Sequence, residues 1–277
     1  MATERANVVS SFTTVKGSMI AETYAVMAAW DFAHTKKENL DRLRKTNFIE
    51  AKSDAWLRDV AKVLNRRIDP AGRDRALVML AKSGCDLEEW KPLLLWHMTR
   101  DEFLFRDFLT HWLFPTCYVG SAHCVRHEDL RPYLGSVGKR GGTTEHAWSI
   151  STSHRVAVGL LRMAADFGLL QGSAVRQFAD YRLPERSFIY LLHHLRDEYQ
   201  SPQRVINALE WRMFLLCPSG VERELQRLSQ SHKLQYEVMG GAVKLTLPCK
   251  SALEYAEAMS QSVRPDMVNP SVFSFLS

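Results

Sequence analysis

The sequence has few cysteines, and they follow no regular spacing. Five cysteines, an odd number, are scattered between positions 85 and 249, which excludes a disulfide framework and is typical of reduced thiols. The segment that holds Cys117, His123, Cys124 and His127 has the residue types of a zinc site. Its spacing matches no common finger or ribbon, and no second ligand pair follows. We therefore expect no structural metal and no other cofactor.

Long apolar runs are also missing. No stretch approaches the roughly 18 apolar residues that a membrane-spanning helix needs. The most apolar segments, residues 91–98 and 103–114, are interrupted by charged side chains. Residues 1–12 lack the charged start and apolar centre of a signal peptide. These features predict a cytoplasmic protein that makes no membrane contact.

The common catalytic signatures are missing as well. Ten histidines are present, but there is no H-E-x-x-H, no G-x-S-x-G and no dinucleotide-binding glycine pattern. The glycine-rich segment 135–146 is not a phosphate loop, because Tyr133 and Arg140 stand where the Walker motif needs glycine and Ser or Thr. His193 and His194 are neighbours on a helix, so their side chains diverge by about 100°. We expect no catalytic residues and no enzymatic activity.

What the sequence does have is length and a basic balance. Its 277 residues are 46% hydrophobic, enough to bury the core of one large domain or of two smaller ones. Lysine and arginine exceed aspartate and glutamate by five, which gives a formal net charge of +5. This excess is compatible with a polyanionic partner and is too small to establish one.

Hydrophobic spacing at the helical period predicts an N-terminal bundle over residues 1–115. Its helices are expected over residues 18–33, 36–45, 53–68, 70–84, 86–98 and 100–114. Ser53 and Asp86 are predicted N-caps, Pro70 fits a first helical turn, Gly84 ends a helix, and Pro92 should bend one. Because no convincing strand interrupts these helices, the predicted fold class is mainly α. Residues 116–277 form a C-terminal helical region, either as a second domain or within one globular domain.

Residues 151–172 carry a clear amphipathic pattern. Ser151 or Thr152 is the expected N-cap, and Gly168 the expected end of the helix. The apolar stripe consists of Val156, Leu160, Met163, Phe167 and Leu170. A second face, about a quarter-turn away, carries Arg155, Gly159, Arg162 and Asp166. A hydroxyl-rich start followed by arginines suits a helix whose N-terminal end meets phosphates, and a merely solvated basic face is the alternative.

Residues 185–247 follow the order of a winged helix, in which three helices precede a hairpin. The second helix is expected over 201–216, and the third presents Arg223, Gln226 and Arg227 opposite its apolar side. Arginine and glutamine can make bidentate contacts with base edges. Alternation around Gly240-Gly241 predicts the hairpin. Residues 125–182 are a second candidate unit of this kind, with the basic helix described above as its third helix. An ordinary surface helix beside an ordinary hairpin is the alternative.

Three segments resemble the BrxA family, a core component of BREX bacteriophage-exclusion systems. They are "GSMIAET" (17–23), "FLFRDFL" (103–109) and "TSHRVAVGLLRMAADFGLLQG" (152–172), and the resemblance covers about residues 12–200. It implies a non-enzymatic, mainly helical, cytoplasmic DNA-binding protein that serves phage defence with a methyltransferase and other BREX proteins. The family supplies no fixed set of binding residues, so the candidate residues come from the sequence pattern alone.

We predict that the protein is a monomer that binds double-stranded DNA with modest sequence preference. The predicted DNA contacts lie in the glycine-rich segment and on two candidate recognition helices: Lys139, Arg140, Thr143, Thr144, Ser151, Thr152, Ser153, His154, Arg155, Arg162, Arg223, Gln226 and Arg227. We favour the helix at 151–166, because its hydroxyl-rich start and the adjoining basic segment offer phosphates more donors. The alternative function is a helical adaptor that binds only other proteins of the complex.

Overall fold

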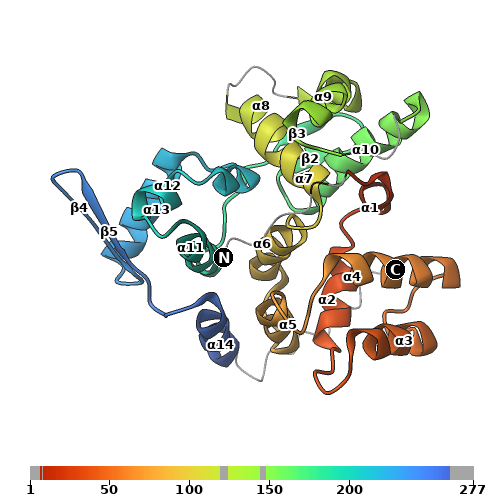
Figure 1. Cartoon of the computed structure of the whole chain (residues 1–277), viewed down its shortest axis with the longest axis horizontal. Coiled ribbons are helices and arrows are strands. Elements are labelled where there is room, and N and C mark those ends of the chain that lie inside the picture. The colour runs from red at the N-terminus through yellow and green to blue at the C-terminus, as the bar shows by residue number, and fades with distance from the viewer. Residues whose placement is uncertain (1–6, 8, 119–123, 144–147, 263–277) are drawn as a thin grey trace.

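The computed structural model describes residues 7, 9–118, 124–143 and 148–262 (Figure 1). These residues are mainly helical, and they add a three-stranded antiparallel sheet and a two-stranded hairpin. The predicted mainly-α class is therefore confirmed. His123 and Thr144 lie outside the described residues.

Several N-terminal helices begin at the capping residues that the sequence predicts. Their bounds are α1 (Ser11–Lys16), α2 (Ile20–Ala28), α3 (Lys36–Thr46), α4 (Asp54–Arg67), α5 (Arg75–Lys82) and α6 (Leu87–Met98). Ser53 and Asp86 cap α4 and α6 through their side chains, as predicted. The helix expected from Pro70 begins only at Arg75. Residues 69–74 instead form a turn, which closes when the Asp69 amide donates a 2.6 Å hydrogen bond to the Asp74 carboxylate.

The helix that was expected to end before Pro115 instead continues through it. It comprises α7 (Phe103–Phe108), the π-helical turn η1 (Leu109–Leu113) and α8 (Phe114–Tyr118). Proline has no amide hydrogen, and its ring crowds the carbonyl four residues earlier. The π-helical turn just before it, where the Phe114 amide donates to the Leu109 carbonyl, widens the helix and lets the chain continue. The expected division at residue 115 falls inside α8.

A small sheet follows, with α10 packed against it. The elements are β1 (Cys124–Val125), η2 (His127–Leu130), α9 (Arg131–Ser136), η3 (Val137–Arg140), α10 (Ile150–Asp166), β2 (Leu170–Gly172) and β3 (Arg176–Phe178). The antiparallel strand order is β1-β3-β2, with Leu170 opposite Phe178. The glycine-rich composition of residues 135–146 is typical of a mobile loop or a boundary. Their described part instead continues α9 into the 3-10 turn η3, which ends at Gly141 in the left-handed region.

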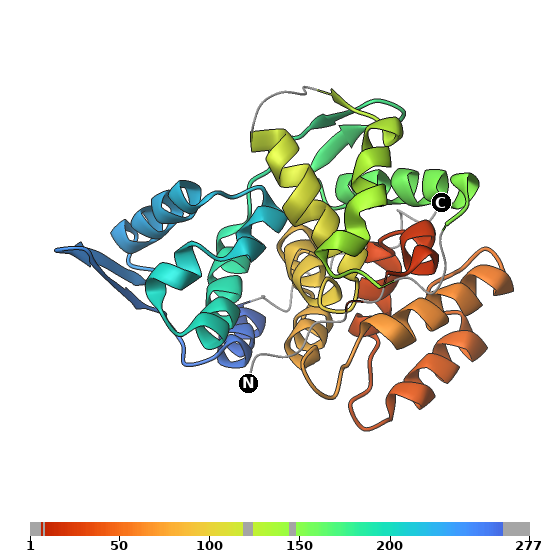
Figure 2. The ribbon, with the colours of Figure 1, turned by 45° about the horizontal axis from the view of Figure 1, so that its top comes forward.

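The last part of the chain contains α11 (Glu185–Tyr199), α12 (Pro202–Ile206), η4 (Leu209–Phe214), α13 (Pro218–Gln230), β4 (Gln235–Met239), β5 (Ala242–Thr246) and α14 (Ala252–Ser262). The predicted hairpin is confirmed, with Gly240 and Gly241 both at positive φ in its turn. It projects away from the helices (Figure 2). The prediction of a single helix over 201–216 is wrong. The helix ends after α12, and the Trp211 indole N–H donates a 2.7 Å hydrogen bond to the Val205 carbonyl.

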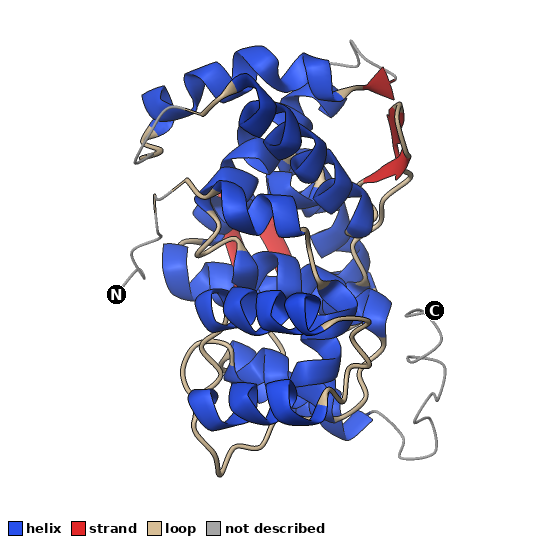
Figure 3. Ribbon diagram, turned by 90° about the vertical axis from the view of Figure 1, so that its right-hand side faces the viewer, coloured by secondary structure: helices blue, strands red, loops and turns tan. Residues whose placement is uncertain are grey.

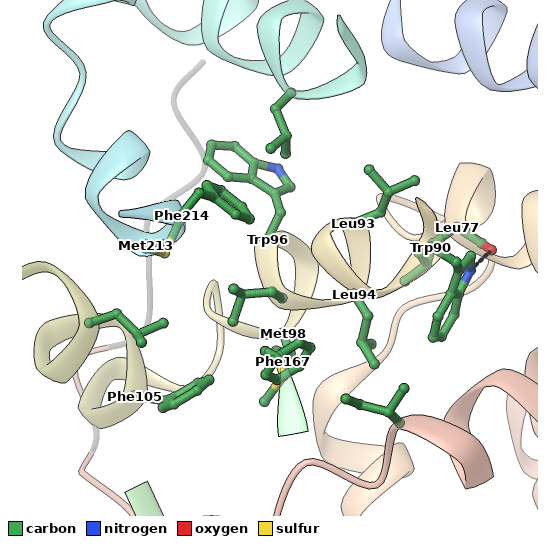
Figure 4. Close-up of a cluster of buried hydrophobic side chains, with 14 of the residues drawn as sticks. Leu77, Trp90, Leu93, Leu94, Trp96, Met98, Phe105, Phe167, Met213 and Phe214 are labelled. Carbon is green, nitrogen blue, oxygen red and sulfur yellow. Dashed lines mark hydrogen bonds between the residues drawn. The ribbon is translucent and has the colours of Figure 1, made fainter. Parts of the chain in front are cut away.

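The core is one connected set of buried side chains that reaches from Val9 to Met259. Around α6, Trp96 and Met98 meet Phe105 of α7, Phe167 beside α10 and Phe214 of η4 (Figure 4). Large apolar side chains from segments far apart in sequence therefore fill one interior, where close packing fixes their relative positions. The predicted apolar stripe is buried throughout, although α10 ends at Asp166 and the last member of the stripe, Leu170, belongs to β2.

Gly159 lies where α10 meets α1. A Cβ at this position would stand 2.6 Å from the backbone oxygen of Thr14. We expect Gly159→Ala to destabilise the fold by about 1–3 kcal/mol, because the backbone of α1 would have to move. Gly135 in α9 has nothing within 4 Å of its own Cβ position. Gly135→Ala is therefore the control and should be neutral or stabilising by up to about 1 kcal/mol. Urea denaturation compares them, and equal effects would contradict this packing.

Candidate nucleic-acid interface

The basic helix α10 begins two or three residues earlier than expected. Ser149 is its N-cap, since its extended backbone lets the side chain accept a 3.2 Å hydrogen bond from the Thr152 amide. Ser151 and Thr152 lie within the first turn, and both hydroxyls are 3.0 Å from the Ser149 hydroxyl. Ser153 is half-buried. The start of α10 is therefore rich in hydroxyl groups, as predicted, although the cap itself differs.

The outer face of α10 is narrower than the sequence suggests. Apart from Ile150 at the start of the helix, its exposed residues are Ser151, His154, Arg155, Val158 and Arg162. At 100° per residue they fall within an arc of about 100°. Gly159 and Asp166, which were expected beside the arginines, instead face α1 and the residues that follow it. Gly159 is packed on Thr14, and Asp166 accepts a 2.6 Å hydrogen bond from the Ser18 hydroxyl. We call the five exposed residues the α10 face.

The two arginines of the α10 face have no ion-pair partner among the described residues. Within the described part of the chain, neither Arg155 nor Arg162 forms a hydrogen bond or an ion pair, and both are exposed. They lie seven residues apart, about 10 Å along the helix on one side of it. A guanidinium with no intramolecular partner can give all its donors to an external anion.

Arg176 on β3 adds a cation that the site prediction missed. Burial lowers the pKa of its guanidinium, and nearby Arg162 lowers that pKa further, whereas Asp166 opposes the shift. Arg176 is thus close enough to α10 for its charge to be felt there. One signal was present in the sequence, because Arg176 lies within residues 125–182, the second candidate winged-helix unit.

The glycine-rich segment splits into residues with different roles. Lys139 is exposed. Arg140 donates through two nitrogens to both carboxylate oxygens of Asp107, at 2.9 Å each, and its guanidinium lies 4.9 Å from the Tyr133 ring centre. Asp107 is only 4% exposed, and its hydrogen bond raises the pKa of Arg140. Thr143 pairs through its backbone with Asn7 and Val9. Arg140 therefore neutralises a buried carboxylate.

The second candidate helix, α13, buries its apolar side as predicted. Arg223 and Gln226 are exposed on the other side. Arg227 is also exposed, but it donates to Glu224 at 3.0 Å and to Glu185 at 3.1 Å. These hydrogen bonds, the one to Glu224 first, raise its pKa. Two carboxylates offset the charge of Arg227, so α13 presents less unpaired positive charge to an anion than α10 does.

The structure also forms an Asp–His–Tyr chain that the sequence did not suggest. His97 lies 2.6 Å from the Asp74 carboxylate and 2.9 Å from the Tyr190 hydroxyl, measured from its two ring nitrogens. All three side chains are at most 1% exposed. A hydrogen-bonded chain sealed in the core satisfies buried polar groups and gives a substrate no access. Among the described residues, no group of three or more His, Cys, Asp and Glu side chains could hold a metal.

His193 makes stability sensitive to acid. It is fully buried, stacks on Tyr255, and its ring nitrogens have no hydrogen-bond partner among the described residues. Burial lowers the pKa of His193 to about 4. Below pH 6.5 the unfolded chain binds the proton first, so stability present above that pH falls by up to about 1.4 kcal/mol per unit down to pH 4.

We expect His193→Leu to remove this contribution, and its stability should therefore fall less steeply than that of the wild type between pH 6.5 and 4. Burial also lowers the pKa of His97 and of His194, so part of the slope should remain in both proteins. Urea denaturation at several pH values measures the difference. Identical slopes would show that His193 is not held neutral by burial.

Comparison with known families matches residues 10–195 to BrxA. The match contains α10 and the three-stranded sheet, whereas α12, α13 and the hairpin β4–β5 lie beyond it. No curated protein and no solved structure matches the chain. Within the described ranges, no helix has the length and apolar character needed to cross a bilayer. Since the match spans well over half of the sequence, the chain belongs to the BrxA family of BREX phage-exclusion systems.

Proposed function

We propose that this chain is a non-catalytic, double-stranded DNA-binding component of a BREX phage-defence system, and that the α10 face is its main DNA contact. It acts in the cytoplasm as a monomer, with a methyltransferase and other BREX proteins. The observation that carries the proposal is the α10 face, where Arg155 and Arg162 are exposed and unpaired within the described chain.

The connectivity around α10 supports this proposal. Helix α8 is followed by β1, α9, α10 and the hairpin β2–β3, and β1 pairs with β3. This is the order of a winged helix, whose third helix enters the major groove while the hairpin lies along the backbone. Arg176 stands on that hairpin, and the hydroxyl-rich first turn of α10 presents free amide groups to phosphates. Both features fit a polyanionic duplex.

Titration of random-sequence duplex DNA, followed by fluorescence anisotropy from 50 to 200 mM salt, tests the proposal. The logarithm of the affinity should fall linearly with the logarithm of the salt concentration, by about 0.9 for each phosphate contact. Competition with double-stranded RNA is the control. Affinity that ignores salt, or a strong preference for RNA, would contradict duplex-DNA binding.

The adaptor function keeps one observation in its favour. The tip of the hairpin β4–β5 exposes Val238 (56%) and Met239 (70%). Exposed apolar side chains on a projecting two-stranded ribbon favour contact with another protein. An adaptor that binds only proteins would show no salt-dependent DNA binding in the same titration.

A further inference from the structure

A shallow groove of about 420 Å³ runs between α3 and α4. Four of its lining residues are cations: Lys37 and Arg44 from α3, Arg58 and Lys62 from α4. The carboxylate in its lining is Asp41, which stands 3.7 Å from Arg44. The groove is therefore lined by positive charges from two packed helices. The sequence pattern did not single out these residues.

Most of this charge has no intramolecular counterpart. Lys37 and Arg58 form no hydrogen bond or ion pair within the described ranges, and both are exposed. Lys62 lies 4.7 Å over the Phe12 ring of α1, a contact that leaves its charge in place. Like charges that face each other across a groove repel, and a bound polyanion relieves that repulsion.

Helices α3 and α4, which line the groove, lie on the same side of the molecule as α10 (Figure 1). Helix α1 connects them, because Thr14 packs on Gly159 of α10 while Lys16 pairs with Asp59 of α4. Helices α10, α1, α4 and α3 follow one another down the right-hand side of Figure 1, the side that faces the viewer in Figure 3. A straight polyanion seated on α10 can therefore continue over α1 toward the groove.

We propose that the α3–α4 groove holds the phosphate backbone of the same duplex that the α10 face contacts. This inference rests on the proposed function and extends the DNA footprint onto the N-terminal helices. The groove lining contains no aromatic ring on which single-stranded bases could stack. Its lysine and arginine side chains instead suit sequence-independent contacts with phosphates.

The double variant Arg58→Ala/Lys62→Ala tests the groove in the full chain, with a labelled 40-base-pair random duplex. We expect affinity to fall about 10- to 100-fold at 0.1 M salt and the salt slope to shrink by about two, one for each lost contact. Lys37→Ala/Arg44→Ala from α3 should also weaken binding, though by less because Arg44 already pairs with Asp41, and this second variant separates charge loss from damage to one helix. Arg204→Ala/Lys250→Ala removes two exposed cations from elsewhere and should leave both quantities unchanged.

The outcomes separate this inference from the function on which it rests. If the wild type does not bind duplex DNA, both fail. If the wild type binds and Arg155→Ala/Arg162→Ala weakens it, but both groove variants keep the wild-type affinity and slope, the groove inference alone is wrong. If the Arg204→Ala/Lys250→Ala control weakens binding as much as the groove variants do, the effect reflects net charge, and the inference is again wrong.

Discussion

Replacing Arg155 and Arg162 with alanine should weaken binding to all duplex sequences alike and reduce the salt slope by about two. Both side chains are exposed and have no partner among the described residues, whereas the apolar stripe of the same helix is buried. Folding should therefore change by less than about 0.5 kcal/mol, as is usual for surface positions. Anisotropy titrations at several salt concentrations and a thermal melt measure the two quantities.

The matched control for this experiment is Arg223→Ala/Arg227→Ala on α13. It removes the same charge, but Arg227 already binds Glu224 and Glu185, so the loss of affinity should be smaller. Lys139→Ala should have a weaker effect than the replacement of either arginine of the α10 face, because ordering the flexible Lys139 side chain on a phosphate costs conformational entropy. If the Arg155→Ala/Arg162→Ala protein melts and binds like the wild type, the α10 face is simply solvated.

Replacing Arg140 with alanine should destabilise the fold by about 3–5 kcal/mol, because it removes the permanent cation from the buried Asp107 carboxylate. The Tyr133 hydroxyl, 2.8 Å from the same carboxylate, supplies a hydrogen bond but no charge, and the His111 ring, 3.1 Å away, is charged only when it is protonated. Urea denaturation of the purified variant measures the loss. Lys139→Ala is the control, since its side chain is exposed, and should stay within about 0.5 kcal/mol.

A second variant makes the role of Arg140 testable even if Arg140→Ala does not fold. Asp107→Leu combined with Arg140→Leu removes both charges, and buried ion pairs replaced by apolar residues often cost little. We expect it to be more stable than Arg140→Ala. An Arg140→Ala protein that keeps its stability and loses DNA affinity would instead make Arg140 a DNA contact, as the sequence pattern suggested.

Local patterns by themselves determined most of the helices and one turn. Val156, Leu160 and Met163 are buried because α10 brings those positions to one side. Ser53 and Asp86 cap their helices through bonds to amides two or three residues away. Gly240 and Gly241 form the hairpin turn because its two central residues need positive φ, which glycine adopts without strain. In each case the interacting groups are close in sequence, so the pattern holds the information.

Tertiary structure alone decided which basic residues remain free. Arg140 and Arg227 look like Arg155 and Arg162 in the sequence, but the fold brings each of the first two to a distant carboxylate, Asp107 or Glu185. The α3–α4 groove likewise exists only because two separate helices pack side by side. Sequence specifies the charge of a side chain, whereas the availability of that charge depends on neighbours that long-range packing supplies.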